Sequence, residues 1–109
     1  MTIESQLLKI NENLLLINSK RTKNYISPDK LQDIKDISED YIPLHLEWIR
    51  KGNNWIAESL TVNDSLDREA FSQLLIGVRN LYLDLEELSD LLINVGIEID
   101  GEIAETLDA

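Results

Sequence analysis

Apolar residues recur at alternating spacings of three and four over residues 71–95. In order they are Phe71, Leu74, Val78, Leu81, Leu85, Leu88, Leu92 and Val95. This is the spacing of the a and d positions of a heptad repeat, and it continues for more than three heptads. It predicts a long helix whose apolar side another surface covers. Ile76 and Leu83 lie on the opposite side of that helix, which favours a central place in a bundle or a homodimer.

Helical spacing also marks the start of the chain, where it predicts a helix over residues 2–20. Thr2 is expected to be its N-cap, and Lys20 suits the negative end of the helix dipole. The apolar positions of this segment are Ile3, Leu7, Ile10, Leu14 and Ile17. They form one stripe, as expected for a helix that packs on a core.

A Ser-Pro-Asp run at positions 27–29 predicts the start of a further helix, with the serine as cap and the proline in the first turn. This helix is expected over residues 28–51. The apolar register is the same before and after Pro43, which favours a kink there over two separate helices. Gly52 is expected to end the helix as its C-cap, and residues 55–60 are expected to form a short separate helix.

The last helix is expected to begin at the acidic capping pair Asp64 and Asp67 and to end at Gly96. Residues 97–109 carry a net charge of −5 and are expected to form a small extension or a flexible acidic tail. The sequence therefore predicts an all-α fold, an antiparallel helical bundle of three main helices plus one short helix. We expect a single domain over residues 1–109, with dimerisation as one way to complete the bundle.

The composition of the 109 residues narrows the function further. The chain has no cysteine, which excludes disulfides, thiolate catalysis and cysteine metal sites. It has no apolar run long enough to span a membrane and no basic and apolar leader at its start, so a soluble cytoplasmic protein without membrane attachment is expected. Only four glycines are present, and no phosphate-binding glycine loop can be written with them.

The net charge of −11 is concentrated in the second half of the chain. Residues 64–109 contribute −10, whereas residues 1–27 contribute +2. Nucleic-acid binding needs a basic footprint, so direct nucleic-acid binding is not expected. Two interpretations of the acidity remain. It either keeps a small protein soluble, or it forms a negative face that meets a partner protein with a basic surface.

Candidate catalytic groups are few. His45 is the only histidine, and no serine or cysteine nucleophile lies in an activating motif. A lone histidine between two leucines is expected to be a packing or surface residue. Asp100-Gly101 is expected to be a turn, because residues 96 and 107 do not supply the oxygen ligands that a calcium loop requires. We therefore expect no enzyme activity, no cofactor and no metal.

Two carboxylates at a spacing of three suggest one alternative function, that of an enzyme. Glu87 and Asp90 form an ExxD pattern, which resembles half of the magnesium site in the MazG-like all-helical nucleotide pyrophosphohydrolases. The resemblance implies a Mg²⁺-dependent hydrolase that also has an ExxE pair on another helix. Asp64 and Asp67 have that spacing but are not glutamates, and the resemblance covers only four residues.

Trp48 and Trp55 lie on either side of Gly52, with Arg50 and Lys51 between them. Tryptophan and arginine are enriched in binding hot spots, but the same cluster could close one end of the bundle as a hydrophobic lid. The residues that we assign to partner binding are Ile76, Leu83, Glu86, Glu87, Asp90, Trp48 and Trp55.

Together these features predict a small acidic helical protein that acts by protein–protein binding, with an inhibitor, antitoxin or immunity role as its most specific form. The alternatives are a self-assembling scaffold component and the pyrophosphohydrolase described above. Gly77 lies inside the long helix next to the apolar stripe. Glycine weakens a helix, so we expect a second helix to approach closely at this position.

Overall fold

The computed structural model describes residues 2–20, 25–63 and 67–101, and within these ranges it is helical with no strand. This confirms the predicted all-α fold. The elements are helix α1 (Ile3–Lys20), helix α2 (Pro28–Asp36), the π-helical turn η1 (Ile37–Tyr41), helix α3 (Ile42–Asn63) and helix α4 (Arg68–Ile99).

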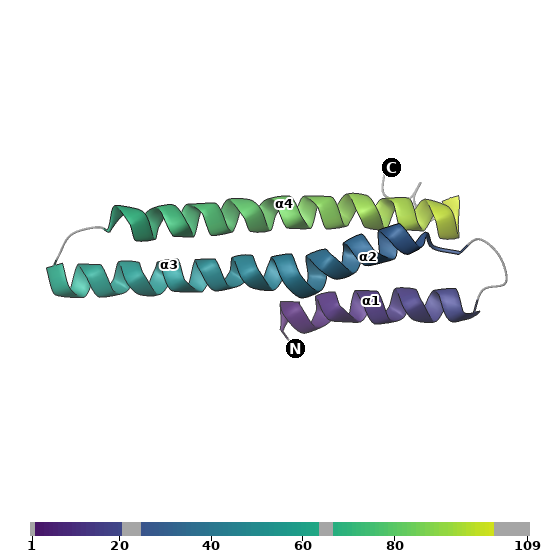
Figure 1. Cartoon of the computed structure of the whole chain (residues 1–109), viewed down its shortest axis with the longest axis horizontal. Coiled ribbons are helices and arrows are strands. Elements are labelled where there is room, and N and C mark those ends of the chain that lie inside the picture. The colour runs from purple at the N-terminus through teal and green to yellow at the C-terminus, as the bar shows by residue number, and fades with distance from the viewer. Residues whose placement is uncertain (1, 21–24, 64–66, 102–109) are drawn as a thin grey trace.

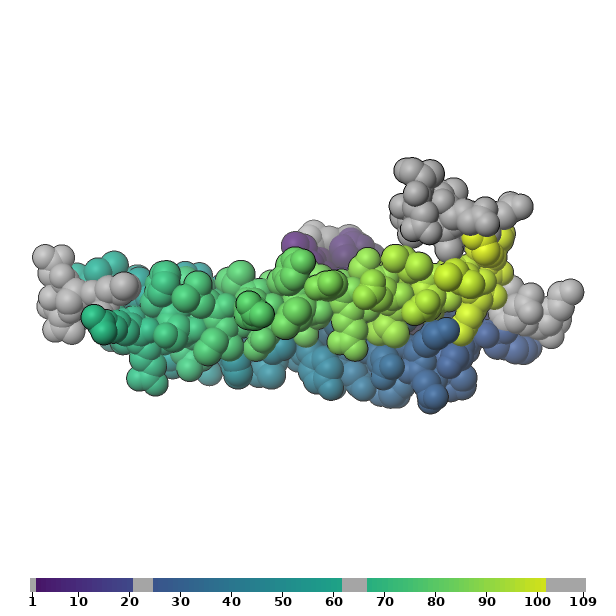
Figure 2. All heavy atoms as spheres, turned by 90° about the horizontal axis from the view of Figure 1, so that it is seen from above, coloured from purple at the N-terminus to yellow at the C-terminus, as the bar shows by residue number. Residues whose placement is uncertain are grey.

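The elements form three antiparallel rods (Figure 1). Because α2, η1 and α3 follow one another without a break, they make a single rod, which lies between α1 and α4 in this view. The molecule measures 63 × 28 × 24 Å and has a radius of gyration of 18.3 Å. A compact domain of this length would have a radius of about 13 Å, so the protein is markedly elongated (Figure 2).

Pro43 widens the middle rod without splitting it. The backbone N–H of Ile42 donates to the carbonyl of Ile37, five residues back, which is the bond of a π-helix. Proline has no N–H, and its ring would clash with the carbonyl four residues back, that of Glu39. The wider turn relieves this clash. The predicted continuous helix is therefore confirmed, with a π-helical turn at the proline.

The predicted starts of the first two helices are confirmed in part. Thr2 caps α1, because its Oγ1 accepts a hydrogen bond from the Ser5 N–H at 3.1 Å. Pro28 occupies the first turn of α2 as expected. The Ser27 side chain makes no capping bond, so that expectation is wrong. Its backbone N–H donates instead to the Glu98 carboxylate at 3.0 Å.

At the start of α4, the carboxylate of Asp67 accepts hydrogen bonds from the N–H groups of Glu69 (3.0 Å) and Ala70 (3.2 Å). Asp67 is therefore the N-cap. The other half of the predicted capping pair, Asp64, lies outside the described residues.

Two predicted helix ends are wrong. Helix α3 passes through Gly52 to Asn63, so residues 55–60 are its last turns and not a separate short helix. Helix α4 passes through Gly96 and ends at Ile99. Gly52 is retained within a helix because it packs closely against α4, as shown below. The part of the predicted tail from residue 102 onward lies outside the described residues.

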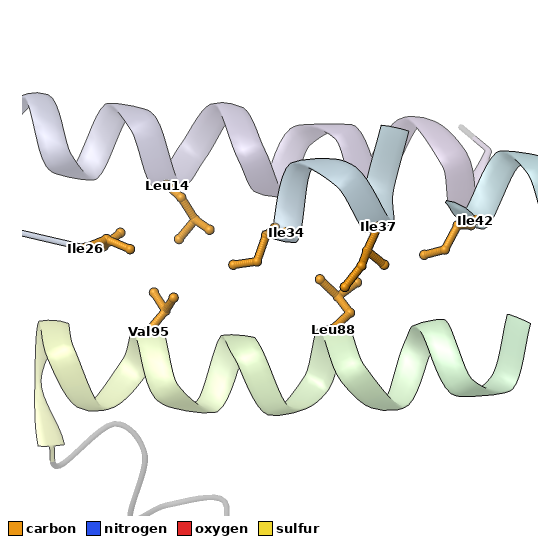
Figure 3. Packing of buried hydrophobic residues seen from close by; sticks show 7 residues of the cluster. All are labelled: Leu14, Ile26, Ile34, Ile37, Ile42, Leu88 and Val95. Atoms are coloured by element: carbon orange, nitrogen blue, oxygen red, sulfur yellow. The ribbon is translucent and has the colours of Figure 1, made fainter. Parts of the chain in front are cut away.

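The buried aliphatic core occupies one part of the molecule, where α1, α2, η1, the start of α3 and the second half of α4 meet. We call this part the body. Side chains from α1, from the middle rod and from α4 point toward one another there (Figure 3). The core cluster consists of Leu14, Ile26, Ile34, Ile37, Ile42, Leu88 and Val95.

Polar contacts hold the connection between α1 and α2 onto the body. The side chain of Asn18 accepts a hydrogen bond from the Ile26 N–H at 2.8 Å and donates to the Ile26 carbonyl at 3.4 Å. Glu98, near the end of α4, pairs with Lys30 and accepts from the Ser27 N–H. These two hydrogen bonds lower the pKa of the Glu98 carboxyl, the lysine contributing more than the backbone N–H.

Beyond the N-terminus of α1, only α3 and α4 continue, side by side, to the far end of the molecule (Figure 1). We call this part the arm and define it as residues 45–63 and 67–84 of the described chain. The arm is a two-helix hairpin without a third helix, and it carries the candidate site.

Candidate interaction surface

Small residues fill the seam between the two helices of the arm. A Cβ atom added at Gly77 would lie 2.9 Å from Ile49 Cγ1 and 3.3 Å from the carbonyl oxygen of His45. One added at Gly52 would lie 3.0 Å from the backbone nitrogen of Leu74. These distances are shorter than ordinary van der Waals contacts, so the two helices approach each other closely at both glycines. The close approach predicted at Gly77 is confirmed.

This close approach rotates α4 away from the predicted register. Ala70, Gly77 and Asp84 are spaced by seven and face α3 as buried residues. The predicted column of Phe71, Val78 and Leu85 is instead 41%, 49% and 44% exposed. The other predicted column is half-buried to buried, and it consists of Leu74, Leu81, Leu88 and Val95. Three of the eight predicted seam positions are therefore wrong, because small residues one position earlier allow the tighter contact. Leu92, further along the same column, packs against the core as predicted.

A polar pair lies at the base of the arm. The Nδ1 atom of His45 hydrogen-bonds Oδ2 of Asp84, which is 8% exposed. The ring of Trp48 meets the imidazole edge-on, with 5.7 Å between centroids. His45 is thus a packed, half-buried residue, as the sequence predicts. Sequence reasoning missed Asp84, although its place seven residues after Gly77 could have signalled it.

One side of the arm continues the side that α1 covers in the body. Ile3 and Leu7 of α1 line a hollow of about 300 Å³ together with Leu46 of α3 and Leu81 of α4. Helical spacing of three and four carries this side along both helices of the arm. We call the continuation the distal strip, and it consists of Ile49, Ile56 and Leu60 on α3 and Phe71, Leu74 and Val78 on α4.

The opposite side of the arm carries the tryptophans. Trp48 lies two residues after Leu46, which turns it about 160° around α3 from the side of the distal strip. Ile76 and Leu83 are displaced similarly around α4, and they are 44% and 47% exposed. Trp55, one heptad after Trp48, is 46% exposed. We call this side the tryptophan face and define it as Trp48, Trp55, Ile76 and Leu83.

Carboxylates border the tryptophan face. Glu87 and Asp90 follow Leu83 at spacings of four and three on the same side of α4, and both are exposed. Glu86 is exposed as well but points away from both helix neighbours. The structure therefore brings six of the seven predicted partner-binding residues to one side of the molecule. The hydrophobic-lid interpretation is wrong, because α3 continues past Gly52 and leaves Trp55 exposed in mid-helix.

The two carboxylate pairs that the pyrophosphohydrolase alternative requires do not lie close together. Asp67 caps the start of α4, and Glu87 lies on the same helix twenty residues later, about 30 Å away along its axis. Asp64 lies outside the described residues. Among the residues that the structure does describe, no group of three or more His, Cys, Asp or Glu side chains could hold a metal ion. The geometry gives this alternative no support.

Comparison with known proteins identifies no family for this chain. No protein-family model, curated protein or solved structure matches this chain. In the described ranges, every helix is too short or too polar to cross a membrane. The site must therefore be interpreted from its own geometry.

Proposed function

We propose that this protein acts by binding another protein through the tryptophan face, and that the partner presents basic side chains around an apolar patch. The observation that carries the proposal is the juxtaposition on one side of the arm of exposed Trp55, Ile76 and Leu83. Large apolar side chains gathered on one surface mark interaction sites more often than scattered ones do, and tryptophan is enriched among the residues that dominate binding energy.

We infer the charge of the partner surface from the residues that border this face. Glu87 and Asp90 lie next to Leu83, and Glu69 lies on the same side near the start of α4. Of the nearby basic residues, Arg50 pairs with Glu47 on α3. Lys51 and Arg79 are exposed on the same side, but the carboxylates outnumber them. A basic surface would gain from these carboxylates both in encounter rate and in orientation. An inhibitor, antitoxin or immunity role, in which the acidic protein occludes a basic site, is the specific form that we propose. A cytoplasmic location and the lack of nucleic-acid binding stay predictions.

A capture experiment with matched variants tests the proposal. The tagged protein is incubated with an extract of its host cells at low and high salt, beside Trp55→Ala and Leu60→Ala. Both of these side chains are 46% exposed, but only Trp55 belongs to the tryptophan face. We expect a basic protein that binds the wild type and Leu60→Ala at low salt. Its capture should fall at least tenfold with Trp55→Ala and weaken at high salt, because salt screens exposed charges.

A charge reversal provides the second arm of this test. Glu87→Lys combined with Asp90→Lys should abolish capture of the same protein while the helical circular dichroism stays unchanged. Capture of no basic protein, or capture that is the same with Trp55→Ala as with the wild type, would show that the tryptophan face is not the binding surface.

A further inference from the structure

The distal strip supports an inference that is independent of the tryptophan face. We propose that a second copy of this chain covers the distal strip, so that two arms pack antiparallel into a four-helix bundle. Where the body meets the arm, α1 borders the same side of α3 and α4, and its Ile3 and Leu7 line a hollow there together with Leu46. The distal strip continues this side of α3 and α4 in the same helical register. Helix α1 does not extend as far as the strip. A pair of apolar helices of the same length fits the vacant side.

The charge of the distal strip favours a second copy over a basic partner. The strip and the helix positions in line with it are 46, 49, 53, 56, 60, 71, 74, 78 and 81, and none of them is acidic in a chain with 21 acidic residues. Asn53 is the only polar residue among them. Along the strip itself a basic surface would therefore meet no carboxylate, and Asp67 at its end is the N-cap of α4. A second arm would meet an equally neutral and apolar strip.

The charge of the whole molecule fits an antiparallel arrangement. Residues 45–84 have four basic and six acidic side chains, a net charge of −2, whereas the other residues of the chain carry −9. Antiparallel arms place the two acidic bodies at opposite ends of the dimer. They are then separated by the length of the arm, about 27 Å for eighteen helical residues, which is well beyond the screening length of about 8 Å in physiological salt.

The size of the distal side is sufficient for a specific dimer. A surface about 27 Å long and two helices, or about 20 Å, wide gives a flat footprint of about 540 Å² on each copy. The total of about 1,100 Å² reaches the area of about 1,000 Å² that a specific interface needs. The exposed members Leu60, Phe71 and Val78 are 41–49% exposed and would lose that exposure in the dimer.

The mass of the protein in solution tests the proposal, with substitutions at side chains of similar exposure. We expect the wild type to sediment at twice the chain mass of 12.5 kDa, and Val78→Glu and Leu60→Glu to sediment as monomers with unchanged helical circular dichroism. Ile76→Glu, which places the same charge on the tryptophan face, should remain a dimer. X-ray scattering should give the dimer a length of about 100 Å, because two 63 Å molecules overlap by one arm.

Cross-linking of an introduced cysteine tests the orientation of the two copies. In an antiparallel dimer of this kind, the two-fold axis places α3 of one copy over α3 of the other. Asn53 lies near the middle of the arm, so it comes close to Asn53 of the second copy. Because the chain has no cysteine, Asn53→Cys should be converted to a covalent dimer by a short bismaleimide. Asn54→Cys, equally exposed but turned away from the distal strip, should not. A wild-type monomer at high concentration would overturn the proposal, as would a dimer that Ile76→Glu dissociates and Val78→Glu does not.

Discussion

The body and the arm hold α4 in different ways. In the body, the second half of α4 packs on α1 and α2 through large aliphatic side chains such as Leu88 and Val95, which are buried with Ile34 and Ile37. In the arm, the first half of α4 packs on α3 through Ala70, Gly77 and the polar Asp84. Both halves carry many leucines and isoleucines, but only in the body do these side chains form a closed core.

This difference is the physical reason why we propose the arm as the interaction surface. Small residues at the seam bring the two helix axes close together, and the large side chains beside the seam are then displaced to the two sides of the hairpin. Among the residues that the structure describes, no third element covers them in the arm. The apolar surface that the arm does not bury on itself is therefore available to other molecules, on the tryptophan face and on the distal strip.

The largest expected effect comes from deleting core volume in the body. Ile34 is fully buried in the core cluster, so Ile34→Ala should lower the free energy of unfolding by about 3 kcal/mol in urea denaturation. Leu75→Ala, at a side chain of the arm that is 56% exposed, should cost less than about 1 kcal/mol. Equal losses for the two variants would contradict the division of the molecule into a packed body and an open arm.

The arm should be more sensitive to added volume at its seam. Gly77→Leu places a side chain where Ile49 and the carbonyl of His45 leave no room, so it should lower the free energy of unfolding by about 2 kcal/mol. Gly101→Ala is the control, because an added Cβ there has no atom within 4 Å. A Gly77→Leu protein with the melting temperature and the mass of the wild type would disprove the close approach of the helices.

The same glycine shows how far sequence reasoning reaches. Periodicity was sufficient to predict the helical class and three antiparallel rods, and Gly77 alone was sufficient to predict a close helix contact. The exact rotation of α4 was not predictable, because two adjacent columns of the helix are both apolar and only the backbone contacts at Gly52 and Gly77 decide between them. For the same reason the sequence wrongly indicates a helix end at Gly52, since glycine occurs both at helix ends and at close helix contacts.

The candidate site was predictable to a similar extent. Trp48, Trp55, Ile76 and Leu83 could be singled out one by one from residue type and spacing, but their meeting on one face depends on α3 continuing through Gly52. The distal strip is not predictable from the sequence, because the heptad spacing places several of its residues in the buried seam. What covers a stripe is a property of the tertiary structure, and periodicity alone does not contain it.

The polar pair at the base of the arm should have a smaller effect. His45→Leu removes the hydrogen-bond partner of Asp84 and leaves a carboxylate that is 8% exposed without it. We expect a loss of about 1.5 kcal/mol in the free energy of unfolding. The double variant His45→Leu/Asp84→Leu should recover most of this loss, because it removes both polar groups together. If the single variant were as stable as the wild type, the pair would not contribute to the junction of arm and body.

The smallest effect is expected at the opposite end of the molecule, where Glu98 joins α4 to Lys30 and the Ser27 N–H. These bonds lower the pKa of Glu98 in the folded protein. The stabilisation is therefore present above the ordinary pKa of the carboxyl and is lost as the pH falls through the lowered value. At neutral pH the free energy of unfolding of the wild type should exceed that of Glu98→Gln by less than about 1 kcal/mol, since the pair is near the surface. The difference should disappear as the pH falls through the lowered pKa of Glu98. Urea unfolding of both proteins across this range measures it, with the exposed Glu87→Gln as the control. A difference that grows as the pH falls would show that Glu98 does not stabilise the body as a charged group.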